Sequence, residues 1–354
     1  MKKIAYTISI LSFFIFSSCT KETEKETPLP IIQVPATYSF SDVDFSGQIT
    51  RQDMLSAMTN YIKPSNDGSV ALDSIKLLNM YSGTGFDNAA LNTSGKQLSN
   101  KTASVFKDKM LNFLKELAYT SKLNRPGSKG ISGTVTSPVR KVLVDGKGFE
   151  FTQAFQKGIM SSVFMEQALN NYLANILLDD NTSATYKAGV GTDMAHHWDE
   201  AYGYFTDSKN FPTEGVSRFW GDYSDGVNLF ISSNATLSLA FRTGRQAIVD
   251  NNKTVVKAQA EIIKVEWTKV AAANAIHYIN DAKKDFGDNA VKFHALSECY
   301  GFVIGIQIGG GSVAESILKT FEQTGFYDIS EVQLTEISNK IATEFKLKSV
   351  ESSL

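Results

Sequence analysis

The chain has 354 residues, of which 42% are hydrophobic and 20% are charged, and its formal net charge at pH 7 is −2. This composition is ordinary for a globular protein with one large domain or two modest ones. No run of basic residues interleaves with aromatic residues, so we expect no nucleic-acid partner.

The first 18 residues have the features of an export signal. Lys2 and Lys3 precede an apolar run over residues 4–16, which is shorter than the roughly 20 residues of a membrane span but suits a signal peptide. Residues 16–19 read Phe-Ser-Ser-Cys, which resembles a bacterial lipobox with Phe in place of the usual Leu. We predict cleavage before Cys19 and a lipid on Cys19 that attaches the protein to a membrane. Simple secretion is the alternative.

Residues 19–37 are predicted to be a flexible tether. They contain the charged segment Lys-Glu-Thr-Glu-Lys-Glu and three prolines, and such a segment cannot bury enough apolar surface to become ordered. A charged stretch directly after a lipidated cysteine resembles the surface-export signals of Bacteroidota lipoproteins, although a plain spacer is equally compatible. We therefore expect an outer-membrane lipoprotein, on either the periplasmic face or the cell surface. Cys299 is the only other cysteine, which leaves no intrachain disulfide once Cys19 is lipidated.

Residues 38–350 have the pattern of one helical domain. Helical spacing predicts helices over residues 48–62, 74–81, 86–91, 101–121, 153–178, 193–204, 217–226, 230–251, 255–286, 289–308, 312–324 and 330–345. The apolar face of the 101–121 helix is expected to hold Val105, Met110, Phe113, Leu114 and Leu117. Residues 139–144 and 149–151, joined by Asp-Gly-Lys-Gly, are typical of a β-hairpin. We predict an all-α bundle with a small β-hairpin insertion.

A ten-residue phrase occurs twice in the chain. The first motif copy is HHWDEAYGYF at residues 196–205, and the second motif copy is HALSECYGFV at residues 294–303. The copies share His, Glu, Tyr and Gly at the same positions. The order of a long helix, a loop and a motif helix also recurs, over residues 153–205 and 255–308. We predict two related halves that arose by internal duplication.

The shared residues lie on one face of each predicted motif helix, because positions i, i+4 and i+7 stack along a helix. A glycine inside a helix costs about 1 kcal/mol relative to alanine, so its recurrence indicates close packing at that point. We predict that the two motif helices contact each other near Gly203 and Gly301.

The repeated His/Glu pairs are candidate metal ligands. A His and a carboxylate one turn apart can bind one ion, and facing helices supply such pairs in carboxylate-bridged bundle proteins. His196, Glu200, His294 and Glu298 would offer nitrogen and oxygen ligands that suit iron, zinc or copper. The alternative is a pair of buried hydrogen bonds that fix the register of the helices. His277 and Asp281 repeat the spacing without the Tyr-Gly pair, which favours a structural or exposed role.

Catalytic motifs are not evident. The sequence contains neither Gly-x-Ser-x-Gly nor His-Glu-x-x-His, so we assign no catalytic residues. The glycine-rich residues 301–311 follow no predicted strand and precede no Lys-Ser/Thr pair, so we expect no nucleotide site there.

Residues 195–200, Ala-His-His-Trp-Asp-Glu, resemble the Gly-x-His-x-x-Glu motif of imelysin-like proteins, with Ala in place of Gly. The resemblance implies a two-part helical bundle, exported by bacteria, often lipid-anchored and linked to iron uptake. It also implies that His197 and Glu200 form the important pair, whereas the repeat favours His196 and Glu200. Residues 154–160, residues 218–221 and the two motif copies further resemble a family of Bacteroidota lipoproteins, over residues 38–346.

Together these features predict a non-enzymatic envelope lipoprotein. We expect it to bind a metal ion or an iron-containing ligand between the two motif helices, in the course of metal acquisition. A metallopeptidase is one alternative, since imelysin-like proteins were once classed so, and it would need a metal-bound water and a general base. A surface interaction module with structural His/Glu pairs is the other.

Overall fold

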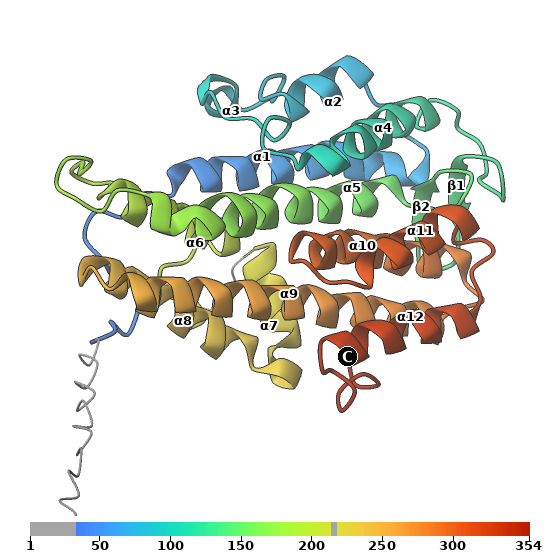
Figure 1. The fold of residues 1–354 in the computed structure, drawn as a ribbon. Helices are drawn as coiled ribbons and strands as arrows, with labels where there is room; N and C mark the ends of the chain where they lie inside the picture. Colours follow the sequence, from blue (N-terminus) through green and yellow to red (C-terminus); the bar gives the residue numbers. More distant parts are fainter. Residues whose placement is uncertain (1–32, 214–217) are drawn as a thin grey trace, which may run out of the picture. The chain divides into compact units, whose positions relative to one another are not determined.

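Helices succeed one another along most of the chain in the computed structural model, which describes residues 33–213 and 218–354 (Figure 1). The predicted signal peptide, the lipidation residue Cys19 and most of the predicted tether lie outside the described residues. Residues 33–354 form a single unit by their contacts.

The α-helices are α1 (Ser46–Ile62), α2 (Ser74–Tyr81), α3 (Ala89–Thr93), α4 (Ser104–Thr120), α5 (Phe151–Ile159), α6 (Asp193–Phe205), α7 (Trp220–Ile231), α8 (Ser233–Val249), α9 (Lys253–Lys284), α10 (Asn289–Ile308), α11 (Ala314–Thr324) and α12 (Glu331–Glu344). A short 3-10 helix, η1 (Lys63–Asp67), continues α1. The helices predicted over residues 74–81 and 289–308 match α2 and α10 at both ends. Most others match within a few residues.

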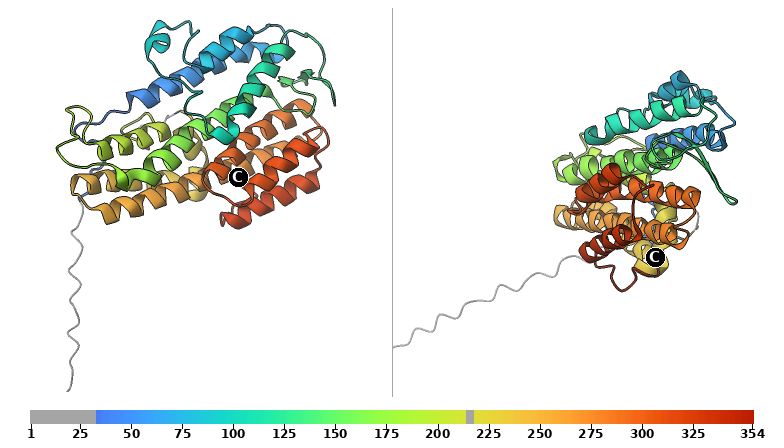
Figure 2. Two further views of the ribbon diagram at one scale, coloured as in Figure 1. Left: turned by 45° about the horizontal axis from the view of Figure 1, so that its top comes forward. Right: turned by 90° about the vertical axis from the view of Figure 1, so that its right-hand side faces the viewer.

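The long helix predicted over residues 153–178 is present and organises the fold. It consists of α5, two π-helical segments, η2 (Met160–Met165) and η3 (Gln167–Tyr172), and a 3-10 segment, η4 (Leu173–Leu178). We call residues 151–178 the central rod. Helices α1 and α4 pack on α5, and α10 packs on α5 and η2. Helix α9 packs on α10, and α7, α8 and α12 pack on α9 (Figures 1 and 2).

Each motif helix packs back on the long helix that precedes it. Helix α6 lies along η3 and η4 of the central rod, and α10 lies along α9. The repeated order of a long helix, a loop and a motif helix is thus accompanied by the same packing in both places. Both motif helices begin at a side-chain cap, since Thr192 Oγ1 accepts from the amide of Ala195 and Asp288 Oδ1 accepts from that of Ala290.

The small β element differs from the predicted hairpin. Strand β1 (Gly133–Thr136) pairs in antiparallel orientation with β2 (Lys141–Val144), so the hairpin turn precedes the Asp-Gly-Lys-Gly segment. The predicted second strand contains the start of α5 instead. The reason is local: Asp145 Oδ1 accepts hydrogen bonds from the amides of Lys147 (2.8 Å) and Phe149 (2.9 Å). This Asx-type turn leads the chain from β2 into the helix.

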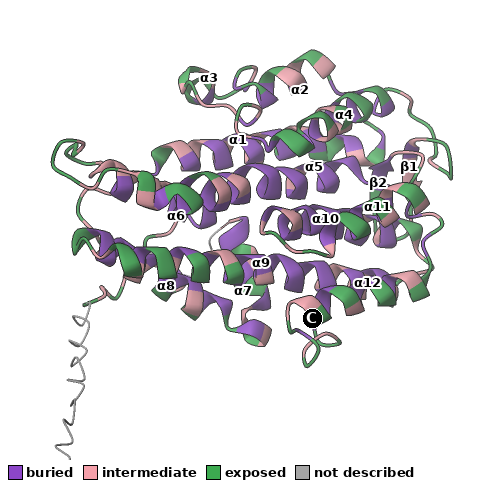
Figure 3. Cartoon of the chain, viewed as in Figure 1, coloured by how far each residue is buried: buried purple, intermediate pink, exposed green. Residues whose placement is uncertain are grey.

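The core lies between the helix layers, where purple buried segments face one another in Figure 3. It includes all three tryptophans, Trp198, Trp220 and Trp267. The predicted apolar face of α4 is correct at Met110, Leu114 and Leu117 but wrong at Val105, which is 73% exposed.

The predicted all-α fold with a small β insertion is confirmed. Within residues 33–213 and 218–354, no helix combines the length and the apolar character that crossing a membrane requires.

Candidate functional site

The first motif copy pairs His196 with Glu200 on the surface of α6. The Nε2 atom of His196 lies 3.9 Å from Oε1 of Glu200, and the two side chains are 30% and 17% exposed. A separation of 3.9 Å is too long for a hydrogen bond. The two groups face the same small space, which solvent can reach.

Glu200 also receives a contact from α1. The Nε2 atom of Gln48 donates to Glu200 Oε1 over 2.7 Å, although Gln48 itself is completely buried. The hydroxyl of Tyr172 on the central rod approaches the same carboxylate. Burial raises the pKa of Tyr172, and the charge of Glu200 adds to the effect. The first pair is therefore enclosed by α1 on one side and by η3 on the other.

Two buried polar atoms at the first pair have no hydrogen-bond partner among the described residues. They are Oε1 of Gln48 and Nδ1 of His196. A buried polar atom without a partner costs on the order of 1–3 kcal/mol, and native proteins usually satisfy such atoms with water, ions or ligands. These atoms indicate that something other than the chain completes this site.

His197 takes a different role from its neighbour. Its Nδ1 atom lies 2.8 Å from Oδ2 of Asp179, and its ring stacks on Tyr172 with centroids 5.2 Å apart. These contacts attach α6 to the end of the central rod. His196, and not His197, is thus the histidine that shares a space with Glu200.

The second motif copy repeats the pair with the same spacing. The Nε2 atom of His294 lies 3.9 Å from Oε1 of Glu298, and the side chains are 18% and 7% exposed. On its other side the His294 ring is fixed by Glu150, whose Oε2 lies 2.6 Å from Nδ1. The pair therefore recurs, but in a more buried setting.

A lysine of the central rod occupies the second site. Lys157 Nζ lies 3.0 Å from Oε1 of Glu298, and both side chains are almost fully buried. Burial alone would raise the pKa of Glu298, but the charges of Lys157 and His294 outweigh it and hold that pKa below its ordinary value. Burial alone would lower the pKa of Lys157, yet Glu298 and Tyr223 raise it above its ordinary value. The carboxylate of this copy is neutralised from within the chain.

The two copies differ in the group that reaches the glutamate, and also in that Glu150 contacts Nδ1 of His294 whereas Nδ1 of His196 has no partner among the described residues. In the first, the side chain that reaches the glutamate Oε1 is the neutral amide of Gln48, and in the second it is the ammonium of Lys157. In both copies this group comes from a helix packed against the motif helix, α1 or α5. Gln48, Lys157, Glu150 and Tyr172 were not predicted as site residues. The one signal in the sequence was a lysine within a run that is otherwise largely apolar.

The structure does not bring the two pairs together. Glu298 contacts the rod at residue 157 and Glu200 contacts it at residue 172. Fifteen residues of helix correspond to a separation on the order of 20 Å. Among the residues that the structure describes, no three His, Cys, Asp or Glu side chains are arranged to hold a metal ion. The prediction that His196, Glu200, His294 and Glu298 converge is wrong.

The predicted contact between the motif helices is also wrong. A Cβ on Gly203 would lie 2.4 Å from Cβ of Phe45, at the start of α1. A Cβ on Gly301 would lie 2.1 Å from Cβ of Lys157. Each glycine does mark a close approach, as predicted, but the partner is the helix that supplies Gln48 or Lys157.

Asp199 forms a second buried cluster beside the first pair. Its Oδ1 atom accepts from Tyr38 (2.6 Å) and from Nε of Arg245 (2.9 Å), and Asp199 is completely buried. Burial raises the pKa of Asp199 to about 6, although Arg245 and Tyr38 act in the opposite direction. The ring of Tyr38 stacks on Tyr202 at 3.7 Å. This cluster fastens the start of the domain to α6 and α8.

A sequence model of the DUF4856 family, described as a domain of unknown function, matches residues 35–348 of the chain. No curated protein and no solved structure matches it.

Proposed function

The chain belongs to the DUF4856 family, and we propose that it is a non-catalytic binding protein of the cell envelope. In this proposal the first motif copy binds iron or another transition-metal ion that is presented in a chelate. The second motif copy is structural. The observation that carries the proposal is the difference between Gln48 and Lys157 at two His/Glu pairs with the same 3.9 Å separation.

The spacing of the first pair fits a shared ion. Protein nitrogen and oxygen ligands lie about 2.0–2.2 Å from ions such as zinc, so two ligands on one ion lie at most about 4.0–4.4 Å apart. The 3.9 Å between His196 Nε2 and Glu200 Oε1 is within that limit. Imidazole and carboxylate together suit iron, zinc and copper.

The charge of the site supports the same proposal. Gln48 donates a hydrogen bond to Glu200 but leaves its negative charge in place. In the second copy, Lys157 already places a positive charge on Glu298. Lys101 acts on Glu200 through its charge but forms no ion pair with it among the described residues, so an external cation meets less opposing charge at the first pair than at the second.

The small number of ligands favours a chelate over a bare ion. A structural metal site uses about four protein ligands, whereas a bound ion with other ligands of its own needs fewer from the protein. The described residues offer two at the first pair, and both are partly exposed. A chelator would supply the remaining ligands.

Isothermal titration calorimetry of the mature chain tests the proposal, with ferric citrate and Zn²⁺ as probes. We expect Glu200→Gln and His196→Ala each to weaken binding at least tenfold. His277→Ala is the matched control, because His277 also lies one turn before a carboxylate, Asp281, on an exposed helix face. His197→Ala should have little effect, since that ring contacts Asp179 instead. A large loss with His197→Ala would favour the imelysin-type pair.

The sharpest variant is Gln48→Lys, which gives the first copy the charge of the second. We expect it to abolish binding of both probes. If the native chain binds neither probe, or if Gln48→Lys binds as tightly as the native chain, the proposal fails. The pairs would then be structural, and the chain an interaction module.

We further propose a lipid on Cys19, an outer-membrane location and a distant relation to imelysin-like proteins. The support is the sequence: an apolar run before Phe-Ser-Ser-Cys and the Ala-His-His-Trp-Asp-Glu phrase. Replacing Cys19 by Ala should release the protein from the detergent phase. A lipid-labelled product of that variant would contradict the assignment of Cys19.

A further inference from the structure

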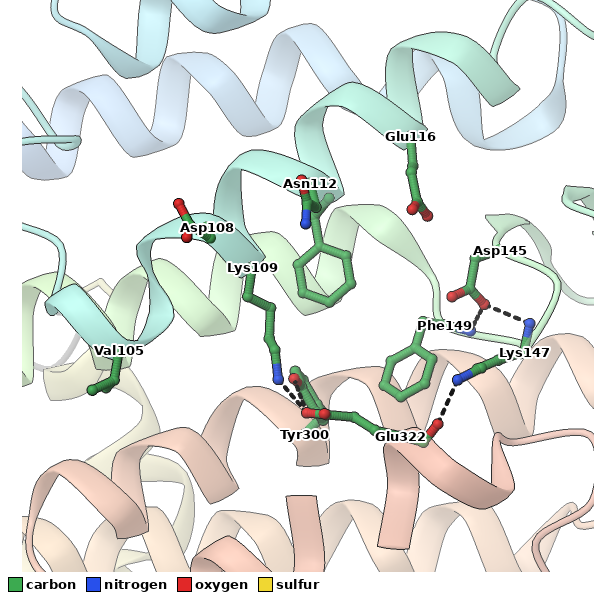
Figure 4. A pocket seen from close by; sticks show the side chains of 11 residues that line it. Val105, Asp108, Lys109, Asn112, Glu116, Asp145, Lys147, Phe149, Tyr300 and Glu322 are labelled. Carbon is green, nitrogen blue, oxygen red and sulfur yellow. Dashed lines mark hydrogen bonds and ion pairs between the residues drawn. The ribbon is translucent and has the colours of Figure 1, made fainter. Parts of the chain in front are cut away.

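An open cleft of about 510 Å³ lies between α4, α10 and α11, and none of the proposed metal ligands lines it (Figure 4). Helix α4 forms one wall, and the β2–α5 loop and α11 form the other. Tyr300 of the second motif copy lies at its base. The volume is within the range of about 300–1,000 Å³ that is typical of small-molecule sites.

The base of the cleft is aromatic and rigid. Phe113 is partly exposed, whereas Phe149 and Tyr300 are buried beside it. The rings of Phe113 and Tyr300 meet edge to face, with centroids 6.1 Å apart, and Phe149 lies 6.4 Å from Phe113. Edge-to-face contacts fix ring orientation. The cleft thus presents one apolar ring that needs little further ordering when a ligand binds.

The wall formed by α4 carries both acceptors and a donor. Asp108, Asn112 and Glu116 occur at intervals of four residues, so they share one side of the helix. All three are exposed, and none has a side-chain hydrogen bond or an ion pair among the described residues. They are free to contact a ligand above Phe113.

Both walls also carry charged groups. Lys109 of α4 forms an ion pair with the carboxylate of Glu322 on α11, and Lys147 of the β2–α5 loop donates to the carbonyl of Glu322 over 2.6 Å. Asp145 faces Glu116 across the cleft (Figure 4). Desolvation raises the pKa of Glu116, and the charge of Asp145 raises it further, which agrees with this proximity.

We infer that this cleft binds a neutral saccharide, with the apolar face of a sugar ring on Phe113 and its hydroxyls on the α4 wall. A hydroxyl group both donates and accepts, so one ligand can use carboxylates, an amide and lysines together. An anionic ligand would meet the carboxylates of Asp108, Glu116 and Asp145, and a cationic ligand, which these carboxylates would attract, is the alternative that the charged competitors test. The sugar can belong to a free oligosaccharide or to a longer glycan chain, and the chemistry of recognition is the same.

Calorimetry with the mature chain tests the inference, using cellotriose, maltotriose, mannotriose and triacetylchitotriose. Trilysine and triglutamate peptides serve as charged competitors. Affinity electrophoresis in gels that contain soluble xylan, mannan or dextran tests glycan chains. We expect at least one saccharide to bind with a Kd below about 1 mM, and neither peptide to do so.

Phe113→Ala should weaken saccharide binding about tenfold, and Asn112→Ala should weaken it about threefold. Tyr119→Ala is the matched control, because Tyr119 is an exposed aromatic residue of α4 that does not line the cleft. Circular dichroism of each variant shows whether the fold is retained. Binding that Phe113→Ala leaves unchanged, an absence of binding across the saccharides and glycans, or binding of a charged peptide alone would overturn the inference. Because Phe113 and His196 lie on different helices, this outcome is independent of the metal titrations.

Discussion

Replacing Lys157 by Met would test whether the second motif copy is held by a buried ion pair. Lys157 is 5% exposed and donates to Gln153 (3.0 Å) and Gln156 (2.8 Å) as well as contacting Glu298. Methionine has a similar length but carries no charge. The substitution therefore leaves Glu298, which is 7% exposed, without its cation.

The expected cost is large because a buried carboxylate stays behind. Removing one partner of a buried ion pair usually destabilises a protein by about 3–5 kcal/mol. The His294 ring remains 3.9 Å from Glu298 and reduces the loss. We therefore expect Lys157→Met to lower the free energy of unfolding by about 3 kcal/mol at pH 7.

The pH dependence that Glu298 gives to the free energy of unfolding should have the opposite sign in the variant. In the native chain the pKa of Glu298 is lowered, so its contribution to stability is present above the unfolded value of about 4.3 and is lost as pH falls through the folded pKa. Without Lys157, burial raises the pKa of Glu298 above that value. The variant should then gain stability as pH falls from neutral towards about 4.3, and its difference from the native chain should shrink.

Urea unfolding followed by fluorescence of the buried tryptophans, at several pH values from neutral to about 4.5, measures both effects. The double variant Lys157→Met/Glu298→Gln should recover part of the stability and lose the altered pH dependence. A cost below about 1 kcal/mol at pH 7, or a difference between variant and native chain that does not change with pH, would refute the reasoning.

Two further predictions concern packing and the Asp199 cluster. Gly301→Ala should destabilise the fold by about 1–3 kcal/mol through overpacking, since its Cβ would overlap Lys157. Gly226→Ala, where a Cβ meets nothing within 4 Å, should be neutral or stabilising by up to about 1 kcal/mol. Thermal unfolding compares the two variants, and equal effects on stability would contradict the close packing at Gly301. Tyr38→Phe should cost about 1 kcal/mol by removing one hydrogen bond to Asp199. Arg245→Met should cost about 3–5 kcal/mol because it isolates a buried carboxylate. If urea unfolding shows a larger loss of stability for Tyr38→Phe than for Arg245→Met, Asp199 is neutral in the native state.

Local periodicity predicted most of the helices, because most present an apolar face to the core, whereas α10 is buried on nearly all sides. The predicted hairpin is right about the turn, since Val144 and Glu150 form an antiparallel bridge across it, but wrong about the second strand, because a turn motif does not determine the type of the next element. The Asp145 turn is real, but it joins β2 to a helix instead of a second strand. Strand β2 pairs instead with β1, a short segment that was not predicted as a strand.

The candidate site was predictable only within each helix. The spacing of His196 and Glu200 follows from helix geometry, and the 3.9 Å separation recurs at His294 and Glu298. Which helices lie against each pair depends on distant segments of the chain. The shared glycines correctly indicated close packing, but a motif that repeats does not have to contact its own copy. Here each copy contacts the helix that supplies Gln48 or Lys157.

The stability of Gln48→Lys separates a functional reason for the glutamine from a structural one. A lysine at position 48 would add an ion pair to the hydrogen bond that Glu200 already accepts, which favours lysine, while burial of the ammonium and the charge of Arg51, three residues along the same buried face of α1, oppose it. These effects nearly balance, so we expect urea unfolding to place the variant within about 1 kcal/mol of the native chain. If Gln48→Lys retains the stability of the native chain but loses metal binding, packing does not explain the glutamine. Gln48 then serves ligand binding, by leaving the charge of Glu200 unpaired. If the variant unfolds much more easily, by about 3 kcal/mol or more, then Gln48 is required by the fold. Loss of binding in that variant would then carry no weight for the metal proposal, which would depend on Glu200→Gln and His196→Ala.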